Sequence, residues 1–480
     1  MATAPGAKRE RRKRIDEDEE DELVDRISRL PDGILGDIVS LLPYKDGART
    51  QVLSSRWRPI WHSAPLNLDL TDGDDKFRIT TDYVSRILSA HQGPGRRFCI
   101  QYCYQTYHGT GGLPAALDGW LRSPALDKLQ ELEFNLSYGS QQSLPPPLPA
   151  SVHRLASTLR AASFGGCGFP EGNNTSPLHL PLLKQLSLLK VRISETSFTS
   201  LLAACPALQT LLLTNIMGCS RVNIVSPSLR SIGLCSCYGG DTFLQQLIIV
   251  IDAPYLERLL CYETDTGMKV TVSVVSAPNL HVLSLLCVRN LKHDAGRTTF
   301  QFGSTVFQRL CILNLVTVVH SVKVLALTQM NLSLDMVINF LKCFPCLENL
   351  YIKTRNAGEK NTWCHKYKNL ISTLEIRLKK IVLRYYRGTT PHVNFAKFFI
   401  LNARMLQSRR LSYLVHIPAK SCSWMERYRS WSHQFLHRAR ANQLREATQQ
   451  GHQAEVEAGG PGLNMIWYEF LRSINNGDGK

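Results

Sequence analysis

The feature that most constrains the fold of this chain is a short apolar motif that recurs along most of its length. The motif is L-x-x-L-x-L with apolar substitutes, and from Leu183 to Leu280 successive copies start 25, 21, 27 and 24 residues apart. Copies begin at Leu129, Leu183, Leu208, Leu229, Leu256, Leu280, Leu310, Val322, Leu347 and Leu378. Self-similarity at a period of about 20–29 residues is typical of structures that stack one small unit many times.

Each copy is expected to form a short strand. Alternate side chains of a strand point the same way, so the last two apolar positions of each copy should build a shared core. Pro cannot donate a hydrogen bond within a sheet, so a Pro two residues before a copy marks the entry to its strand. Such prolines are Pro181, Pro206, Pro227, Pro254, Pro278 and Pro345.

The segments between copies must return the chain to the start of the next strand. Two of them have apolar residues at i, i+3 and i+4, which predicts helices: Phe198, Leu201 and Leu202, and Val337, Phe340 and Leu341. One unit cannot bury its own apolar edge, whereas stacked neighbours can, and the result is a curved solenoid.

The repeat resembles the leucine-rich repeat, in an irregular form. The Asn that usually follows the last Leu by three residues is mostly replaced, and the residues there are Val191, Ile216, Cys237, Val288 and Val318. The fold class predicted from this resemblance is an α/β solenoid of irregular leucine-rich repeats over residues 110–352.

A second informative stretch lies near the N-terminus, at residues 25–62. Pro31 suits the first turn of a helix, and Asp32 adds a negative charge near the positive end of the helix dipole. The apolar stripe of this helix is Ile34, Leu35, Ile38, Leu41 and Leu42, and Pro43 ends it. Further short helices are predicted from about residue 46 to 53 and around Trp57, Ile60 and Trp61. Because a unit this small is marginal alone, we expect its apolar face to dock on something.

The same stretch resembles the F-box, the motif that binds the Skp adaptor of cullin-RING ubiquitin ligases. The matching residues are Asp25-Arg26-Ile27-Ser28, Leu30-Pro31-Asp32, Ile34-Leu35, Leu41-Leu42, Leu53-Ser54, Arg56-Trp57 and Ile60-Trp61. The resemblance implies a small three-helix F-box over 25–66 that precedes the solenoid. It also implies adaptor contacts at Leu30, Pro31, Ile34, Leu35, Ile38, Leu53 and Trp57. The alternative is an ordinary three-helix cap on a repeat domain.

The C-terminal part carries a third resemblance, to the FBD region of plant F-box proteins. It rests on residues 335–352, on Leu378-Lys-Lys-Ile-Val-Leu and on Phe395-Ala-Lys-Phe-Phe-Ile-Leu-Asn-Ala-Arg. The resemblance implies that 353–415 form the last repeats with a helix between them, which Val393, Ala396, Lys397 and Ile400 indicate. Arg409 falls where the following strand usually has an apolar residue.

Beyond the repeats, Trp424, Tyr428, Trp431 and Phe435 lie at i, i+4, i+7 and i+11. This spacing predicts an amphipathic helix over 416–445, either a cap on the open end of the solenoid or a helix that binds a partner. Residues 446–480 are predicted to be a flexible tail, and so are the charged residues 1–24, where a basic cluster meets seven consecutive acids from Asp16 to Glu22.

The net charge of +17 is unevenly placed, because residues 350–445 hold 20 Lys and Arg against three acids. A basic region attracts nucleic acid or an acidic partner. No nucleic-acid-binding signature accompanies it, so a solvated face is the favoured interpretation and nucleic acid is not an expected partner. An acidic or phosphorylated segment of a protein substrate would suit it.

Neither a membrane span nor a secretory signal is predicted, which places the protein in the cytoplasm, the nucleus or both. The fourteen Cys are then expected to be free thiols. Cys343-x-x-Cys346 and His433-x-x-x-His437 are lone pairs, so no metal site is predicted. Nucleophile-elbow, P-loop, zincin and dinucleotide motifs are all missing, and we predict a non-enzyme without cofactors.

Three function classes follow. The first is the substrate-recognition subunit of an SCF-type ubiquitin ligase, which binds Skp and, through it, cullin, and holds a protein substrate on the solenoid. The second is a leucine-rich-repeat interaction scaffold that is not coupled to degradation. The third is a nucleic-acid-associated factor that uses the basic C-terminal third.

Overall fold

The structure is a computed structural model of the whole chain. It describes residues 27, 29–70, 81–101, 112–136, 144–171, 178–236, 245–263, 269–287, 299–308, 311–314, 317–356, 375–384, 389–403, 405–406 and 408–412. The chain divides into two compact units, one of residues 1–100 with 119–130 and the other of residues 101–118 with 131–480. The tails predicted at 1–24 and 446–480 and the helix predicted at 416–445 lie outside the described residues.

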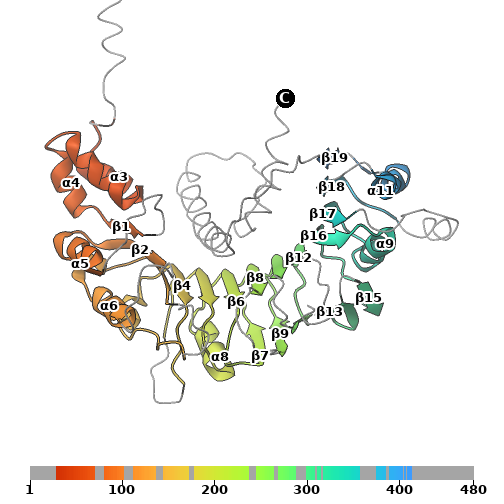
Figure 1. The fold of residues 1–480 in the computed structure, drawn as a ribbon, viewed down its shortest axis with the longest axis horizontal. Helices are drawn as coiled ribbons and strands as arrows, with labels where there is room; N and C mark the ends of the chain where they lie inside the picture. Colours follow the sequence, from red (N-terminus) through yellow and green to blue (C-terminus); the bar gives the residue numbers. More distant parts are fainter. Residues whose placement is uncertain are drawn as a thin grey trace, which may run out of the picture. The chain divides into compact units, whose positions relative to one another are not determined.

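The described residues of the first unit include three short helices joined by tight turns near their start (Figure 1). They are α2 (Asp32–Leu41), α3 (Tyr44–Arg49) and α4 (Trp57–Ser63), with a single 3-10 turn, η1 (Thr50–Val52), after α3. The helix predicted near residues 46–53 is therefore divided between α3 and η1. Pro43 lies directly before α3 and Pro59 lies in the first turn of α4, where the missing N–H leaves no helical bond unmade.

These helices are tied to a strand pair that follows them in the same unit. Strand β1 (Leu66–Asp69) pairs in parallel with β2 (Gly95–Gln101), and α5 (Thr81–Ala90) lies between them in sequence. The Asn67 amide donates to the carbonyl oxygen of Leu42 over 2.8 Å, and Arg96 donates to Ser40 Oγ over 3.0 Å. The base of the three-helix unit is thus fixed by hydrogen bonds as well as by packing.

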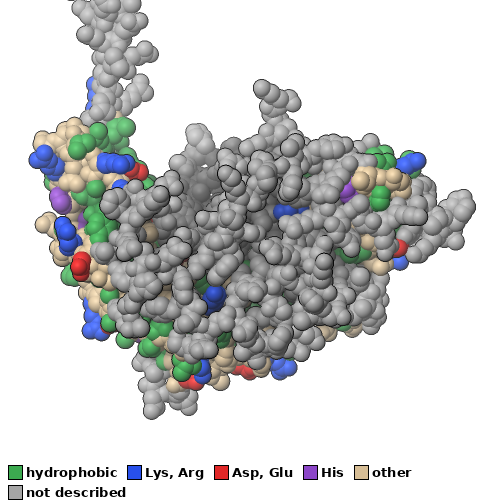
Figure 2. Space-filling view, viewed as in Figure 1, with side chains coloured by type: hydrophobic (Ala, Val, Ile, Leu, Met, Phe, Trp, Pro, Cys, Tyr) green, Lys and Arg blue, Asp and Glu red, His purple; other side chains and the backbone are tan. Residues whose placement is uncertain are grey.

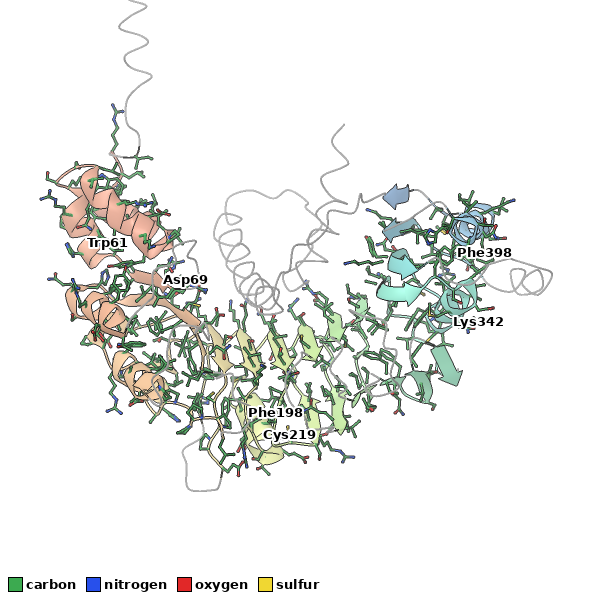
Figure 3. All side chains as sticks on the ribbon, in the orientation of Figure 1. Trp61, Asp69, Phe198, Cys219, Lys342 and Phe398 are labelled. Carbon is green, nitrogen blue, oxygen red and sulfur yellow. The ribbon has the colours of Figure 1, made fainter. Side chains whose placement is uncertain are left out.

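A buried ion pair joins the two strands. The guanidinium of Arg97 lies 3.0 Å from the Asp69 carboxylate, and both side chains are largely excluded from solvent. Figure 3 shows Asp69 at the end of β1 and Trp61 on α4. Because removing one partner of such a pair leaves a buried charge, it holds β1 and β2 in a single register.

Among the described residues of the second unit, eleven strands follow one another in a parallel sheet. They are β3 (Glu131–Asn135), β4 (Ala161–Gly165), β5 (Gln185–Leu189), β6 (Thr210–Thr214), β8 (Ser231–Ser236), β10 (Arg258–Glu263), β12 (Val282–Cys287), β16 (Val324–Asn331), β17 (Asn349–Asn356), β18 (Lys380–Arg384) and β19 (Ser408–Ser412). Neighbouring strands pair motif to motif, so that Leu186, Leu211 and Ile232 are opposite one another. These inward positions are fully buried, which confirms the predicted core of the repeats.

The return segments are of two kinds. Two are the predicted helices, α8 (Glu195–Ala203) and α9 (Leu334–Cys343), and Phe198 on α8 is buried (Figure 3). Others are strands that pair in parallel as a second sheet: β7 (Arg221–Val225), β9 (Gln245–Asp252), β11 (Lys269–Val274) and β13 (Thr299–Phe302). In Figure 1, α8, β7 and β9 lie on the opposite side of the unit from β4, β6 and β8.

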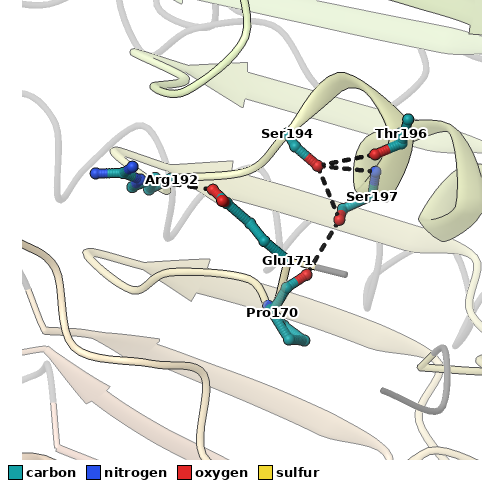
Figure 4. Close-up of polar contacts among 6 residues, drawn as sticks. All are labelled: Pro170, Glu171, Arg192, Ser194, Thr196 and Ser197. Atoms are coloured by element: carbon teal, nitrogen blue, oxygen red, sulfur yellow. Dashed lines mark hydrogen bonds and ion pairs between the residues drawn. The ribbon is translucent and has the colours of Figure 1, made fainter. Parts of the chain in front are cut away.

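The start of α8 shows how one repeat is attached to the one before it (Figure 4). Ser194 Oγ accepts a hydrogen bond from the backbone N–H of Ser197 over 3.2 Å, which caps the helix. Ser197 Oγ in turn donates to the carbonyl oxygen of Pro170 over 3.1 Å, and Arg192 lies 3.7 Å from Glu171. Neighbouring repeats are thus joined through their return segments as well as through the sheet.

One predicted repeat strand is wrong. The copy that begins at Leu310 contributes β15 (Cys311–Asn314), which pairs antiparallel with β14 (Thr305–Gln308) in the second sheet. The cause is the hairpin between β13 and β14, where Gly303 has a positive φ of 55° and lets the chain reverse. Strand β4 was missed, because its first inward position is the small Ala162 rather than a Leu.

The predicted helix near residue 393 forms, as α11 (Thr390–Asn402), but with another face buried. His392, Phe395, Phe398 and Phe399 are inside, whereas Val393 and Ile400 are exposed. The aromatic face of α11 is the buried one because it has the larger apolar area, and the free energy of burial scales with that area. Strand β19 also forms, with Arg409 opposite Ile381.

Candidate functional site

The candidate site is the outer face of the three helices in the first unit, and it begins on α2. Leu35 and Val39 point into the unit and are 0% and 1% exposed, whereas Ile34 and Ile38 are 48% and 38% exposed. Residues four apart lie on one face of a helix, so α2 has two apolar faces, only one of which is covered. Such an exposed apolar pair is available to a partner, because its burial would be favourable.

A second exposed apolar segment follows at the end of η1. Val52 is 85% exposed and Leu53 is 64% exposed, and Ile27 and Pro31 are also exposed. Figure 2 shows hydrophobic side chains at the surface over these helices, among Lys and Arg. Val52 was not among the predicted contacts; an apolar residue beside Leu53 in a turn of otherwise polar residues is the signal that could have found it.

The predicted contact residues divide into two groups. Pro31, Ile34, Ile38 and Leu53 are exposed, and Leu30 is partly buried. Leu35 and Trp57 are buried, in one cluster with Val39, Ile60, Trp61 and Ala64. Leu35 and Trp57 thus lie in the core behind the exposed residues, and adaptor contact stays a prediction for all seven.

The turn that opens α2 is held by a single arginine. Arg56, just before α4, donates to the carbonyl oxygen of Leu30 over 2.6 Å and to Asp32 Oδ1 over 2.8 Å. This links the Leu30-Pro31-Asp32 turn to α4 and so sets the direction in which Pro31 and Ile34 face. The sequence motif includes Arg56 without indicating a role; its positioning role follows from the hydrogen bonds.

The back of the site is packed with aromatic rings and is uncharged. The rings of Tyr44 and Trp61 are 5.5 Å apart, and those of Trp61 and His91 are 5.7 Å apart. Burial lowers the pKa of His91, which outweighs the opposite effect of its 2.9 Å hydrogen bond to the Ala64 carbonyl oxygen. Burial also raises the pKa of Tyr44. Both groups are therefore neutral at pH 7, and the site acts through shape and apolar contact.

The described residues contain no cluster of three or more His, Cys, Asp or Glu side chains able to hold a metal ion. Burial raises the pKa of the Cys343 thiol to about 12, so this half of the Cys-x-x-Cys pair is protonated and a poor nucleophile at neutral pH. Within the part of the chain that the structure describes, no helix is long and apolar enough to cross a membrane.

Comparisons with known proteins find family models that match the repeats and the C-terminal region. A family model described as the LRR repeats of FBD-associated F-box protein At5g56370 matches residues 117–352, and the FBD model matches residues 368–410. An Arabidopsis thaliana protein named for an F-box, At3g58860, is 26% identical over 419 residues, covering 79% of this chain and 86% of the relative.

Two further relatives come from the same plant. The FBD-associated F-box protein At5g27750 is 24% identical over 445 residues, which cover 81% of this chain and 92% of the relative. F-box/LRR-repeat protein 13 is 29% identical over 246 residues, covering 49% of this chain and 51% of the relative. The similarity thus extends over most of the described repeats.

Proposed function

We propose that this chain, which belongs to the F-box/FBD/LRR-repeat proteins of plants, is the substrate-recognition subunit of an SCF-type (Skp-cullin-F-box) ubiquitin ligase. Residues 25–66 are the F-box that binds a Skp adaptor and, through it, cullin. The repeats over 110–352 and the FBD-like region over 353–415 hold a protein substrate for ubiquitination.

The observation that carries this proposal is the exposure of four apolar side chains, Ile34, Ile38, Val52 and Leu53, on a well-packed three-helix unit. A monomeric protein gains nothing from leaving such side chains in water, whereas a protein that binds an apolar groove does. The relatives named for an F-box support the Skp adaptor as the partner.

In this role the chain supplies no catalytic residue. It acts by proximity: a substrate held on the repeats reaches a high effective concentration near the ubiquitin-transferring enzyme, which the adaptor and cullin bring to the same complex.

The test compares two pairs of exposed apolar residues on two helices. Ile34→Ala/Ile38→Ala truncates the proposed contact face. Val393→Ala/Ile400→Ala truncates residues of similar exposure, 44% and 45%, on α11. Truncating central anchors of an interface costs about 2–4 kcal/mol, which is roughly 30- to 1000-fold in affinity. We expect the first variant to lose co-purification with a Skp adaptor and the second to keep it. Full adaptor binding by the folded first variant would refute the assignment.

A further inference from the structure

The N-terminal edge of the parallel sheet carries an ordered row of charged side chains. From β5 to β18, the residue immediately before each strand donates its backbone N–H to the carbonyl oxygen of the corresponding residue one strand earlier in the sheet, and the first acceptor is Arg160, before β4. Lys184 donates to Arg160 over 2.8 Å and Gln209 to Lys184 over 2.8 Å, and the bond repeats as far as Lys379. We call these residues the basic rim. These hydrogen bonds hold the backbones of the rim residues in a row, one residue per strand, at the interstrand spacing of about 4.8 Å.

The charges of the basic rim do not balance. Its cations are Arg160, Lys184, Arg230, Lys323 and Lys379, and its acids are Glu257 and Glu348. Both acids are already in ion pairs: Glu348 with Lys379 at 2.9 Å, and Glu257 with Arg230 at 3.0 Å. Among the described residues, Arg160, Lys184 and Lys323 make no ion pair, and Arg160 and Lys323 are exposed.

The middle of the rim is the most crowded with positive charge. Glu257 is shared between Arg230 and Arg258, whose guanidinium lies 3.4 Å from it. Nε of Arg258 is buried without a hydrogen-bond partner. The pKa of Arg258 is lowered, first by burial and also by the charge of Arg230, against the opposing effect of Glu257. An anion placed beside Arg230 would relieve the repulsion between the two guanidinium groups.

From these observations we propose that the basic rim binds an extended acidic segment of the substrate. The inference rests on the proposed function, which makes the partner a protein substrate. Eight strand steps from Arg160 to Lys379 span about 38 Å, which is the length of about twelve extended residues. A single-stranded nucleic acid fits less well, because it needs aromatic side chains for base stacking and the outward residues beside the rim, such as Gln185, Thr210 and Val324, are not aromatic.

The test uses the full-length chain and a fluorescein-labelled peptide of alternating Glu and Ser, about twelve residues long. A second peptide has Gln in place of Glu, and a third has phosphoserine in place of Glu. The rim variant is Lys184→Glu/Lys323→Glu. The matched control is Lys342→Glu/Lys397→Glu, which makes the same charge change on α9 and α11 at positions of matching exposure class; Figure 3 shows Lys342 on α9.

The wild-type chain and the control should bind the Glu peptide, within twofold of each other, and the rim variant should bind at least tenfold more weakly. Raising the salt from about 50 to 200 mM should weaken binding of the native chain, because exposed charges are screened. The affinity of the phosphoserine peptide, compared with that of the Glu peptide, shows whether the rim binds phosphate groups as well as carboxylates. Equal affinity for the Glu and Gln peptides, an equal loss in the control, or tighter binding of polyuridylate that the rim variant abolishes would overturn the inference.

Adaptor co-purification is measured in parallel on the same variants. Adaptor co-purification should be unchanged in the rim variant and in its control, because the rim and the three helices belong to different units. A loss of adaptor binding by Ile34→Ala/Ile38→Ala with peptide binding intact would separate the two surfaces. Failure of the wild-type chain to bind the Glu peptide would remove the rim from the account and leave the adaptor proposal standing.

Discussion

The three helices and the repeat strands use the same apolar residue types in opposite ways. On α2, Ile34 and Ile38 remain in water while Leu35 and Val39 fill the core. On strands such as β6, both apolar positions of the motif, Leu211 and Leu213, are buried, and charged residues lie at the rim where the strands begin. One region therefore offers apolar area for a partner of fixed shape, and the other offers charge, which selects among partners.

The largest expected effect comes from one charge placed in each region. Leu211→Asp puts a carboxylate into the shared core of the repeats, where it should cost about 4 kcal/mol or more and unfold neighbouring repeats. Ile34→Asp places the same charge at an exposed position in the first turn of α2, where its effect on stability should stay within about 0.5 kcal/mol. Thermal melting and limited proteolysis of the two variants distinguish them. An unchanged melting curve for Leu211→Asp would mean that position 211 is not in a core.

A smaller contrast comes from two glycines within the three-helix unit. A Cβ at Gly47 would lie 2.5 Å from Cζ3 of the buried Trp61, closer than two carbon atoms can approach, whereas a Cβ at Gly33 meets nothing within 4 Å. Gly47→Ala should therefore destabilise by about 1–3 kcal/mol through overpacking. Gly33→Ala should stabilise by about 0.5–1 kcal/mol, because Gly is a poor helix residue. Denaturant unfolding of the two variants measures both signs; a neutral Gly47→Ala would argue against the packing of Trp61 on α3.

The smallest effect concerns pH. The pKa of His91 is lowered in the folded chain by burial, so the unfolded chain binds a proton more readily. The stability that neutral His91 contributes is complete above the unfolded pKa of about 6.5 and is lost as the pH falls through the lower folded pKa. The melting temperature of the first unit should therefore fall between pH 7 and pH 5. In the His91→Gln variant, this dependence of the melting temperature on pH should be weaker. The same dependence in the His91→Gln variant would assign the effect to another group.

The repeat core could be predicted from the sequence because every copy of the motif has the same spacing of apolar residues. Two inward apolar positions in each strand leave one pairing of neighbouring strands that buries both. The sequence could not distinguish the copy at Leu310 from the others, since β15 has the same alternation and differs only in direction, which the hairpin at Gly303 decides. On α11 it identified a helix but the wrong face, because apolar residues lie all round it and the aromatic ones took the interior.

At the candidate site the same limit applies. The motif lists Ile34 and Leu35 side by side, and periodicity alone does not say which of two apolar faces of α2 is covered. The placement of Trp57 in the core and the role of Arg56 in fixing the Leu30 turn both depend on contacts between residues more than twenty positions apart. Such contacts are set by packing rather than by local pattern.

The central claim is that the adaptor binds the three helices and leaves the repeats free for a substrate. Hydrogen–deuterium exchange of the full-length chain, with and without a saturating Skp adaptor, tests this directly. The account predicts that protection is gained within residues 27–63, strongest around α2 and η1, and that the strands from β4 to β18 are unchanged. Protection that appears on the repeat strands instead, or none within residues 27–63 when the adaptor is bound, would contradict it.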